Sequence, residues 1–353
     1  MQPRDSAVAI WLAVCAACVL GMVSLGGYTR LSQSGLSIVE WKPILGVVPP
    51  VDERSWAAEF ANYQETPEFL LRTVPMTLDE FQQIYWVEWA HRALARFTGL
   101  VFLVPLVIWT IRGRLRGVRL YRLLALFVLG LMQGAVGWWM VKSGLIRDAR
   151  VSPYRLALHL NLALVLCGGL VWCAASEWDR RSCVKQYKSA SLERLAYLLV
   201  LVLLGATETW GALMAGLHAG HIAPTFPRMN GAWIPPGLHI DGSAVFEDPL
   251  TVHFVHRALA ALSFVAGIFA AGITLRRRHR LPRDTRWPTL CPSEGIACAL
   301  LALLAVQVSL GIATVLSHVA LSIALLHQAT GALVLMCAVL SMREQGKTNA
   351  TKS

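Results

Sequence analysis

HRALARFTGLVFLVPLVIWT occupies residues 91–110, and HRALAALSFVAGIFAAGITL occupies residues 256–275. The two stretches share their first five residues, carry no charge after their first two turns, and are followed by Arg112 and Arg276. A helix of about 20 apolar residues crosses the hydrocarbon core of a bilayer. The sequence therefore predicts two membrane-spanning helices that begin with the same His-Arg pair.

The composition of the whole chain agrees with a membrane protein. Of the 353 residues, 56% are hydrophobic and only 15% are charged, whereas roughly a quarter of the residues in a soluble domain are charged. This composition excludes a soluble globular protein, and the abundance of apolar residues excludes a disordered one. The fold class that we predict is an all-α polytopic membrane protein.

Eight apolar runs are long enough to span a bilayer. The first run begins seven residues into the chain and lacks a small-residue cleavage site, so we interpret it as a retained helix rather than a signal peptide. The predicted spans cover residues 7–28, 85–111, 121–142, 154–176, 194–217, 251–275, 292–316 and 319–342.

The net charge of +11 carries information about topology rather than about nucleic acid. The basic residues form short clusters between apolar runs, with five Arg in 112–122 and six Arg in 276–286, whereas segment 218–250 holds only Arg228. By the positive-inside rule, both termini are cytoplasmic and segments 29–83 and 218–250 lie outside. We expect a multi-pass protein of the cell (inner) membrane, with no nucleic-acid partner and with short interfacial helices near 55–63 and 78–85.

The two halves of the chain resemble each other. Besides the shared pentapeptide, Gln133-xxx-Gly137 recurs as Gln307-xxx-Gly311, and Leu-His recurs at 158–159 and 326–327. Three ordered matches at comparable spacing indicate two tandem, similar four-helix bundles. The predicted domains are 1–176 and 194–342, joined by a cytoplasmic linker, 177–193, and followed by a cytoplasmic tail, 343–353.

Each helix that runs from outside to inside carries one histidine near its outer end. These residues are His91, His159, His256 and His327. Histidines within membrane spans are uncommon and mark candidate functional sites. Two of them on facing helices are a standard way to hold a haem iron. Hydrogen bonding between helices is the alternative. We expect each four-helix unit to hold one haem between its second and fourth helices.

One difference between the halves suggests unequal roles. Glu88 precedes His91 by three residues and shares its helix face, whereas the matching residue in the second half is His253. A carboxylate beside only one haem favours chemistry in the first half, although Glu88 could instead simply meet Arg92.

Basic and imidazole side chains near the outer ends give further candidates. Arg30, Arg92 and Arg257 are possible partners for haem propionates, with interfacial snorkelling as the alternative. His218 and His221 could bind copper or zinc or could simply lie solvated in a loop.

Several longer motifs resemble those of the haem A synthase family. They extend over about residues 10–342 and are EWAHR at 88–92, LH at 158–159, HR at 256–257, LHQ at 326–328, GGYTRLSQSGLS at 26–37, NYQETPEF at 62–69, QGAVGWWMVKSG at 133–144 and TFPRMNGAW at 225–233. The long first loop lacks cysteine pairs, as in the proteobacterial and mitochondrial branch.

This resemblance implies an oxidoreductase that converts the C8 methyl group of haem O into a formyl group, giving haem A for cytochrome oxidase. It implies that His91 and His159 hold the substrate haem O and that His256 and His327 hold a haem b cofactor. It also implies that Glu88 is the catalytic carboxylate.

Two other function classes stay open from the sequence. One is a bis-histidine dihaem cytochrome that only transfers electrons, and the other is a haem chaperone or exporter. The presence of Glu88 in one half alone favours the enzyme. Haem O as substrate, a haem O synthase, membrane lipid, an unidentified redox partner and a second copy of the chain are the candidate partners.

Overall fold

The computed structural model describes residues 5–41, 45–71, 74–146, 149–178, 191–279 and 291–346. Eight helices in these ranges are long and apolar enough to cross a membrane. They are α1 (Ser6–Leu31), α4 (Leu78–Ile111), α5 (Gly117–Ile146), α6 (Pro153–Trp178), α7 (Ser191–Gly216), α9 (Pro249–His279), α10 (Pro292–Leu316) and α11 (Leu321–Gly346). The prediction of an all-α, eight-span protein is therefore confirmed.

Short helices interrupt the two long connections. The first connection holds η1 (Leu45–Val47), α2 (Glu53–Gln64) and α3 (Pro67–Leu70), and the second holds η3 (Ala219–His221) and α8 (Ala244–Glu247). The predicted helix near 55–63 corresponds to α2. The predicted separate helix near 78–85 is wrong, because these residues form the first turns of α4.

The early start of α4 has a local cause. The Thr77 hydroxyl accepts a hydrogen bond from the backbone N–H of Glu80, and the Glu80 carboxylate accepts one from the N–H of Thr77. This capping box satisfies two of the N–H groups left open at a helix start. No glycine or proline occurs between residues 78 and 98, so the helix continues into the membrane span without a break.

The chain packs as two compact units. The first unit is Ala17–Leu166, and the second unit combines Met1–Ala16 with Cys167–Ser353. Each unit contains one pair of the candidate histidines. The sequence-based domains 1–176 and 194–342 stay predictions, and the predicted linker and tail lie largely outside the described residues.

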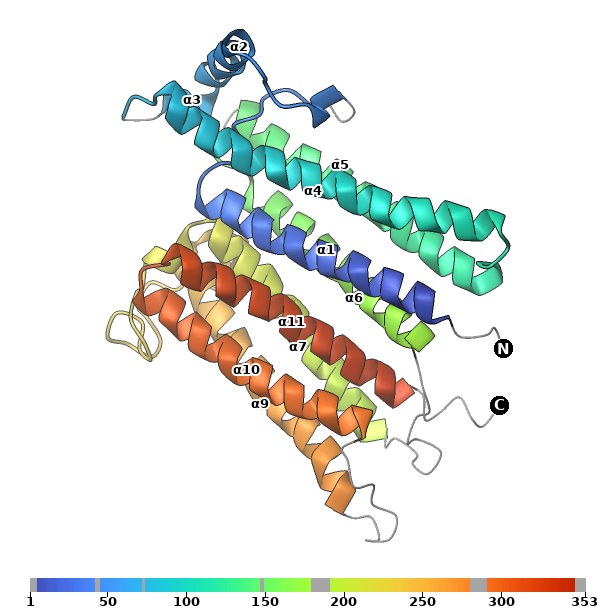
Figure 1. The fold of residues 1–353 in the computed structure, drawn as a ribbon. Coiled ribbons are helices and arrows are strands. Elements are labelled where there is room, and N and C mark those ends of the chain that lie inside the picture. Colours follow the sequence, from blue (N-terminus) through green and yellow to red (C-terminus); the bar gives the residue numbers. More distant parts are fainter. Residues whose placement is uncertain are drawn as a thin grey trace. The chain divides into compact units, whose positions relative to one another are not determined.

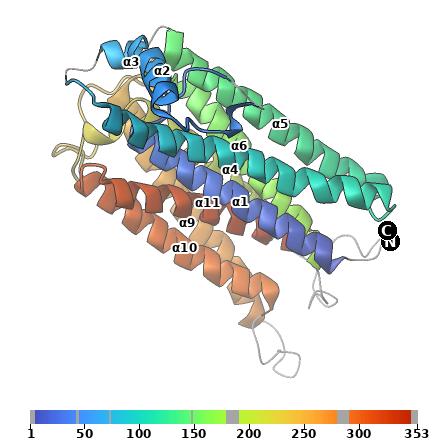
Figure 2. The ribbon, with the colours of Figure 1, turned by 45° about the horizontal axis from the view of Figure 1, so that its top comes forward.

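In the first unit, aromatic side chains join the first long connection to the beginning of α4. Helices α2 and α3 lie near the first turns of α4 (Figures 1 and 2). Phe81 is fully buried, and the rings of Trp56 and Tyr85 meet edge to face with centroids 5.0 Å apart. Burial of large aromatic rings supplies much of the packing energy here, so this connection has a fixed place next to the helix that carries His91.

In the second unit, α7, α9, α10 and α11 pack side by side (Figure 1). Their shared core includes Tyr197, Leu300 and Val334, each fully buried. Far from His256, the Glu193 carboxylate of α7 accepts a hydrogen bond from Thr274 and pairs with Arg277 of α9 at 2.8 Å. These contacts fasten α7 to α9 at one end and leave the opposite end to the histidines.

Candidate functional site

The second unit brings the imidazole rings of two predicted site residues close together. The imidazole rings of His256 in α9 and His327 in α11 have centroids 6.5 Å apart and planes at 86°. An imidazole nitrogen binds a first-row metal at about 2.0–2.1 Å, so two rings on opposite sides of one metal atom have centroids roughly 6 Å apart. The pair is therefore spaced to hold a single metal atom between its two rings.

The hydrogen bonds of His256 select the nitrogen that can bind a metal. Its Nδ1 lies 3.1 Å from the backbone carbonyl oxygen of Thr207. A carbonyl oxygen only accepts, so Nδ1 carries the hydrogen and the lone pair is on Nε2. Metal-ligating histidines typically donate their second ring N–H in this way. The Nδ1 atom of His327 is buried.

The first unit holds His91 in α4 and His159 in α6. The Gln133 side-chain amide of α5 donates to the backbone carbonyl of His159 at 3.0 Å and lies 3.4 Å from the Nε2 atom of that ring. The Nδ1 atom of His159 is buried. Gln133 therefore contacts the start of α6 at the level of the candidate ligand.

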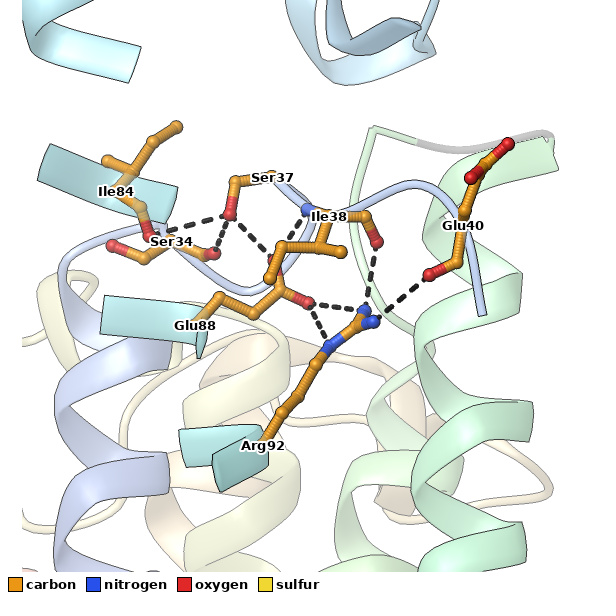
Figure 3. Close-up of polar contacts among 7 residues, drawn as sticks. All are labelled: Ser34, Ser37, Ile38, Glu40, Ile84, Glu88 and Arg92. Carbon is orange, nitrogen blue, oxygen red and sulfur yellow. Dashed lines mark hydrogen bonds and ion pairs between the residues drawn. The ribbon is translucent and has the colours of Figure 1, made fainter. Parts of the chain in front are cut away.

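Glu88 lies one turn before Arg92 and forms the centre of a polar cluster (Figure 3). Glu88 is 3% exposed, and its carboxylate accepts four hydrogen bonds. Oε2 accepts from the Ser37 hydroxyl at 2.7 Å and from the Ile38 backbone N–H at 2.8 Å. Oε1 accepts from Nε and Nη2 of Arg92 at 3.1 and 2.7 Å. The carboxylate therefore ties the segment after α1 to α4.

Arg92 completes this cluster by binding backbone carbonyl groups. Its Nη2 donates to the carbonyl of Ile38 at 2.9 Å, and its Nη1 donates to that of Glu40 at 3.2 Å. Arg92 and Glu88 together thus hold both the N–H and the C=O of Ile38. The contact between Glu88 and Arg92, which the sequence offered as an alternative to catalysis, is present in the structure.

The second unit repeats the arginine contacts with a different partner. Arg257 Nε donates to Nε2 of His253 at 3.0 Å, and its Nη2 donates to the carbonyls of Ala223 and Thr225 at 3.0 and 2.8 Å. We call each arrangement an arginine clamp: an arginine, the side chain four residues before it, and two carbonyls of the preceding connection. An imidazole supports the clamp in the second unit, so the clamp itself does not require an acid.

The three candidate propionate partners differ in their remaining donors. Arg257 Nη1 is buried without a hydrogen-bond partner among the described residues, so it can still bind an anionic group. Arg92 already uses all three of its guanidinium nitrogens in the first clamp. Arg30 lies in the last turn of α1.

Comparison with known proteins places the chain in a family. Residues 9–339 match the family model COX15-CtaA, described as cytochrome oxidase assembly protein. The chain belongs to this family. Three similar proteins are called haem A synthase. The protein of Maricaulis maris is 42% identical over 96% of this chain and 95% of its own length. The protein of Bradyrhizobium sp. ORS 278 is 41% identical over 96% of this chain and 91% of its own length. The protein of the Wolbachia of Culex pipiens is 39% identical over 91% of this chain and 92% of its own length.

Membership of the COX15-CtaA family confirms the resemblance seen in the motifs. In the described ranges, no group of three or more His, Cys, Asp or Glu side chains could hold a metal ion. His218 and His221 therefore lack a third side-chain ligand of these types for copper or zinc.

One acidic residue in this family member was missed from the sequence. Glu208 lies inside the α7 span, and its Oε1 is 2.6 Å from the position that a Cβ on Gly331 would take. The signal was available, because an acid within an apolar run marks a functional candidate.

Proposed function

We propose that this chain is a haem A synthase, an oxidoreductase that converts the C8 methyl group of haem O into the formyl group of haem A. The observation that carries the proposal is the pair of facing imidazoles in the second unit, in a chain whose full-length relatives bear that enzyme name. The conversion adds one oxygen atom to the methyl carbon and removes electrons and protons from it, so it requires water as a source of that oxygen atom and a redox partner that accepts the electrons.

His256 and His327 are the proposed axial ligands of a haem b. Their ring separation of 6.5 Å and the engaged Nδ1 atom of His256 support this assignment. When bound, haem b supplies one-electron redox chemistry. The protein's part is to hold the two imidazoles at this separation, with Nδ1 of His256 engaged so that its Nε2 lone pair is free to bind. The spare Nη1 donor of Arg257 is the proposed partner of a haem propionate.

His91 and His159 are the proposed ligands of the substrate haem O in the first unit. The hydrogen bond from Gln133 to the backbone of His159 holds the start of α6 in place. Arg92 and Arg30 are proposed to contribute positive charge for the propionates of this haem, although the three guanidinium nitrogens of Arg92 already have protein partners in the structure.

Glu88 is the proposed catalytic carboxylate. Oxidation of the methyl carbon develops positive charge at that carbon, and a carboxylate held by preorganised donors stabilises such charge most in a site poor in water. Glu88 is buried on the helix that carries His91, and the second unit builds the same arginine clamp with His253. The acid at position 88 is thus not needed for the clamp as such, which supports a chemical role.

In the membrane, the proposed orientation places both termini in the cytoplasm and all four histidines toward the outer side of the cell membrane. The arginine-rich segments 112–122 and 276–286 support it through the positive-inside rule. Haem O reaches such a site from the lipid phase or from a haem O synthase, because its apolar tail disfavours release into water.

A bis-histidine electron-transfer cytochrome is the rival function, and pigment analysis separates it from the synthase. The purified chain, produced together with a source of haem O, should release haem b together with haem O, hydroxylated haem O or haem A. An electron carrier, in contrast, would release haem b alone. That second outcome would overturn the proposed function.

A further inference from the structure

Both proposed haem b ligands lie directly against a glycine of the preceding long helix. A Cβ on Gly211 of α7 would lie 3.2 Å from Cε1 of His256, and one on Gly311 of α10 would lie 3.0 Å from Cε1 of His327. The normal contact between a methyl carbon and a ring carbon is about 3.5–4.0 Å. Any larger residue at either position must push the imidazole away.

The first unit contains the same contact at the matching glycine. A Cβ on Gly137 of α5 would lie 2.8 Å from Cε1 of His159. His91 differs in orientation, because its Nε2 atom rather than Cε1 is nearest to Gly26, at 3.2 Å from a Cβ placed there. Gly137, Gly211 and Gly311 thus share one geometry, with the Cε1 edge of the ring turned toward the glycine.

This closeness is not a general property of the glycines in these helices. Gly134 in α5, Gly205 in α7 and Gly295 in α10 have no atom within 4 Å of the position that a Cβ would take. Glycines often serve close packing between membrane helices. At Gly137, Gly211 and Gly311, however, the atoms nearest to the Cβ position belong to a histidine ring and not to the backbone of another helix.

The missing Cβ also opens a path to the helix backbone. In an α-helix the N–H of Gly211 points toward the carbonyl of Thr207, four residues earlier. That carbonyl accepts the hydrogen bond from Nδ1 of His256 at 3.1 Å. Gln133 and Gln307 occupy the equivalent place, four residues before Gly137 and Gly311. The edge of the ring can come this close to the helix only where the residue four positions after that carbonyl lacks a side chain.

We propose that Gly211 and Gly311, and Gly137 in the first unit, are positioning residues that set the orientation of an axial imidazole toward the haem iron. This inference rests on the haem ligation proposed above. This role accounts for the Gln-xxx-Gly motif that recurs in both halves, because its glycine leaves helix backbone uncovered where the edge of the ligand ring packs. A methyl group at that position tilts the ring and shifts its Nε2 atom.

The test uses the purified full-length chain with haem b bound. Gly211→Ala and Gly311→Ala are compared with the matched controls Gly205→Ala and Gly295→Ala on the same two helices. We expect the controls to keep the wild-type low-spin absorption and electron paramagnetic resonance spectra. The two test variants should lose at least half of the wild-type low-spin signal, through shifted g values or a high-spin fraction.

Helix propensity cannot cause the expected loss of signal, because alanine forms helices better than glycine and so favours the folded helix. A spectral change in the test variants alone therefore comes from the ring contact. Unchanged spectra in both Gly211→Ala and Gly311→Ala would overturn the proposal, and so would equal changes in the controls. If wild-type protein shows no bis-histidine haem, the proposed function fails first, which is a distinct result.

A second measurement covers a variant that does not accumulate. In a His327→Ala background the ring is gone, so adding Gly311→Ala should not lower the yield or the melting temperature below those of His327→Ala alone. If Gly311→Ala lowers stability equally with and without His327, the glycine serves helix packing and the proposal is wrong.

Discussion

The guanidinium of Arg92 and the carboxylate of Glu88, one turn apart on α4, form a partly buried ion pair of 2.7 Å, and both side chains also bind the main chain of Ile38. The matching pair in the second unit is Arg257 and His253, at 3.0 Å. The two units thus share a clamp and differ in the charge of one residue. That difference is where the proposed chemistry of the two units diverges.

Replacement of Glu88 should stop product formation without emptying the second haem site. We expect Glu88→Ala and Glu88→Gln to lower haem A formation by about a hundredfold, since loss of one preorganised electrostatic group in an active site has that order of effect. Haem b should stay at the wild-type level, because Glu88 lies in the first unit. Chromatographic quantification of haems b, O and A after co-production with a haem O source measures both quantities.

The matched control for Glu88 is His253→Ala. This change removes the clamp partner of Arg257 but no proposed catalytic group, so its effect on haem A should be far smaller. Wild-type amounts of haem A from Glu88→Ala would refute the catalytic role.

Glu88 should also order the segment that follows α1. The Ile38 N–H donates to its carboxylate, and a hydrogen-bonded amide exchanges its proton slowly. In Glu88→Ala we expect faster deuterium uptake at residues 34–40, whereas residues 223–225 in the second unit should exchange as in wild type. Equal uptake at 34–40 in both proteins would mean that the carboxylate does not hold this segment.

Loss of either proposed axial ligand in the second unit should abolish low-spin haem b. A six-coordinate low-spin iron needs both imidazoles, so His256→Ala and His327→Ala should each give no low-spin spectrum or a high-spin one. Added imidazole should restore part of the low-spin absorption in each variant. A full, unshifted low-spin spectrum in both variants would exclude these residues as ligands.

The proposed orientation can be checked with reporter fusions. A reporter fused at Arg116, between α4 and α5, should report a cytoplasmic location. Reporters fused within 50–70 or 225–245 should report a location outside the cytoplasm. The basis is the concentration of arginine in 112–122. The reverse pattern would move all four histidines to the cytoplasmic side.

The spans and the matching positions of His91 and His256 were predictable because each rests on a local pattern. Long apolar runs fix the helices, and the repeated His-Arg pair places His91 and His256 at matching positions. The early start of α4 was less visible, since its first turns are amphipathic and a capping box at Thr77 rather than an apolar residue begins it.

The clamp partners of the arginines could not be predicted from residue types. Arg92 and Arg257 bind backbone carbonyls, and every residue offers a carbonyl, so the sequence carries no mark of which ones are used. The glycine contacts had a signal, the repeated Gln-xxx-Gly motif, but its spacing alone indicates only common ancestry. Its role depends on which side chain of the neighbouring helix points at it, and packing decides that.

The most direct test of the central claim is the formation of haem A in membranes that otherwise lack it. A host that makes haem O but no haem A is given this chain, and the extracted haems are identified by mass spectrometry. Our account predicts haem A together with haem b in the wild-type membranes and haem O without haem A when the chain carries Glu88→Ala. Membranes that hold abundant chain and haem b, with haem O unchanged and no hydroxylated or formylated product, would contradict it.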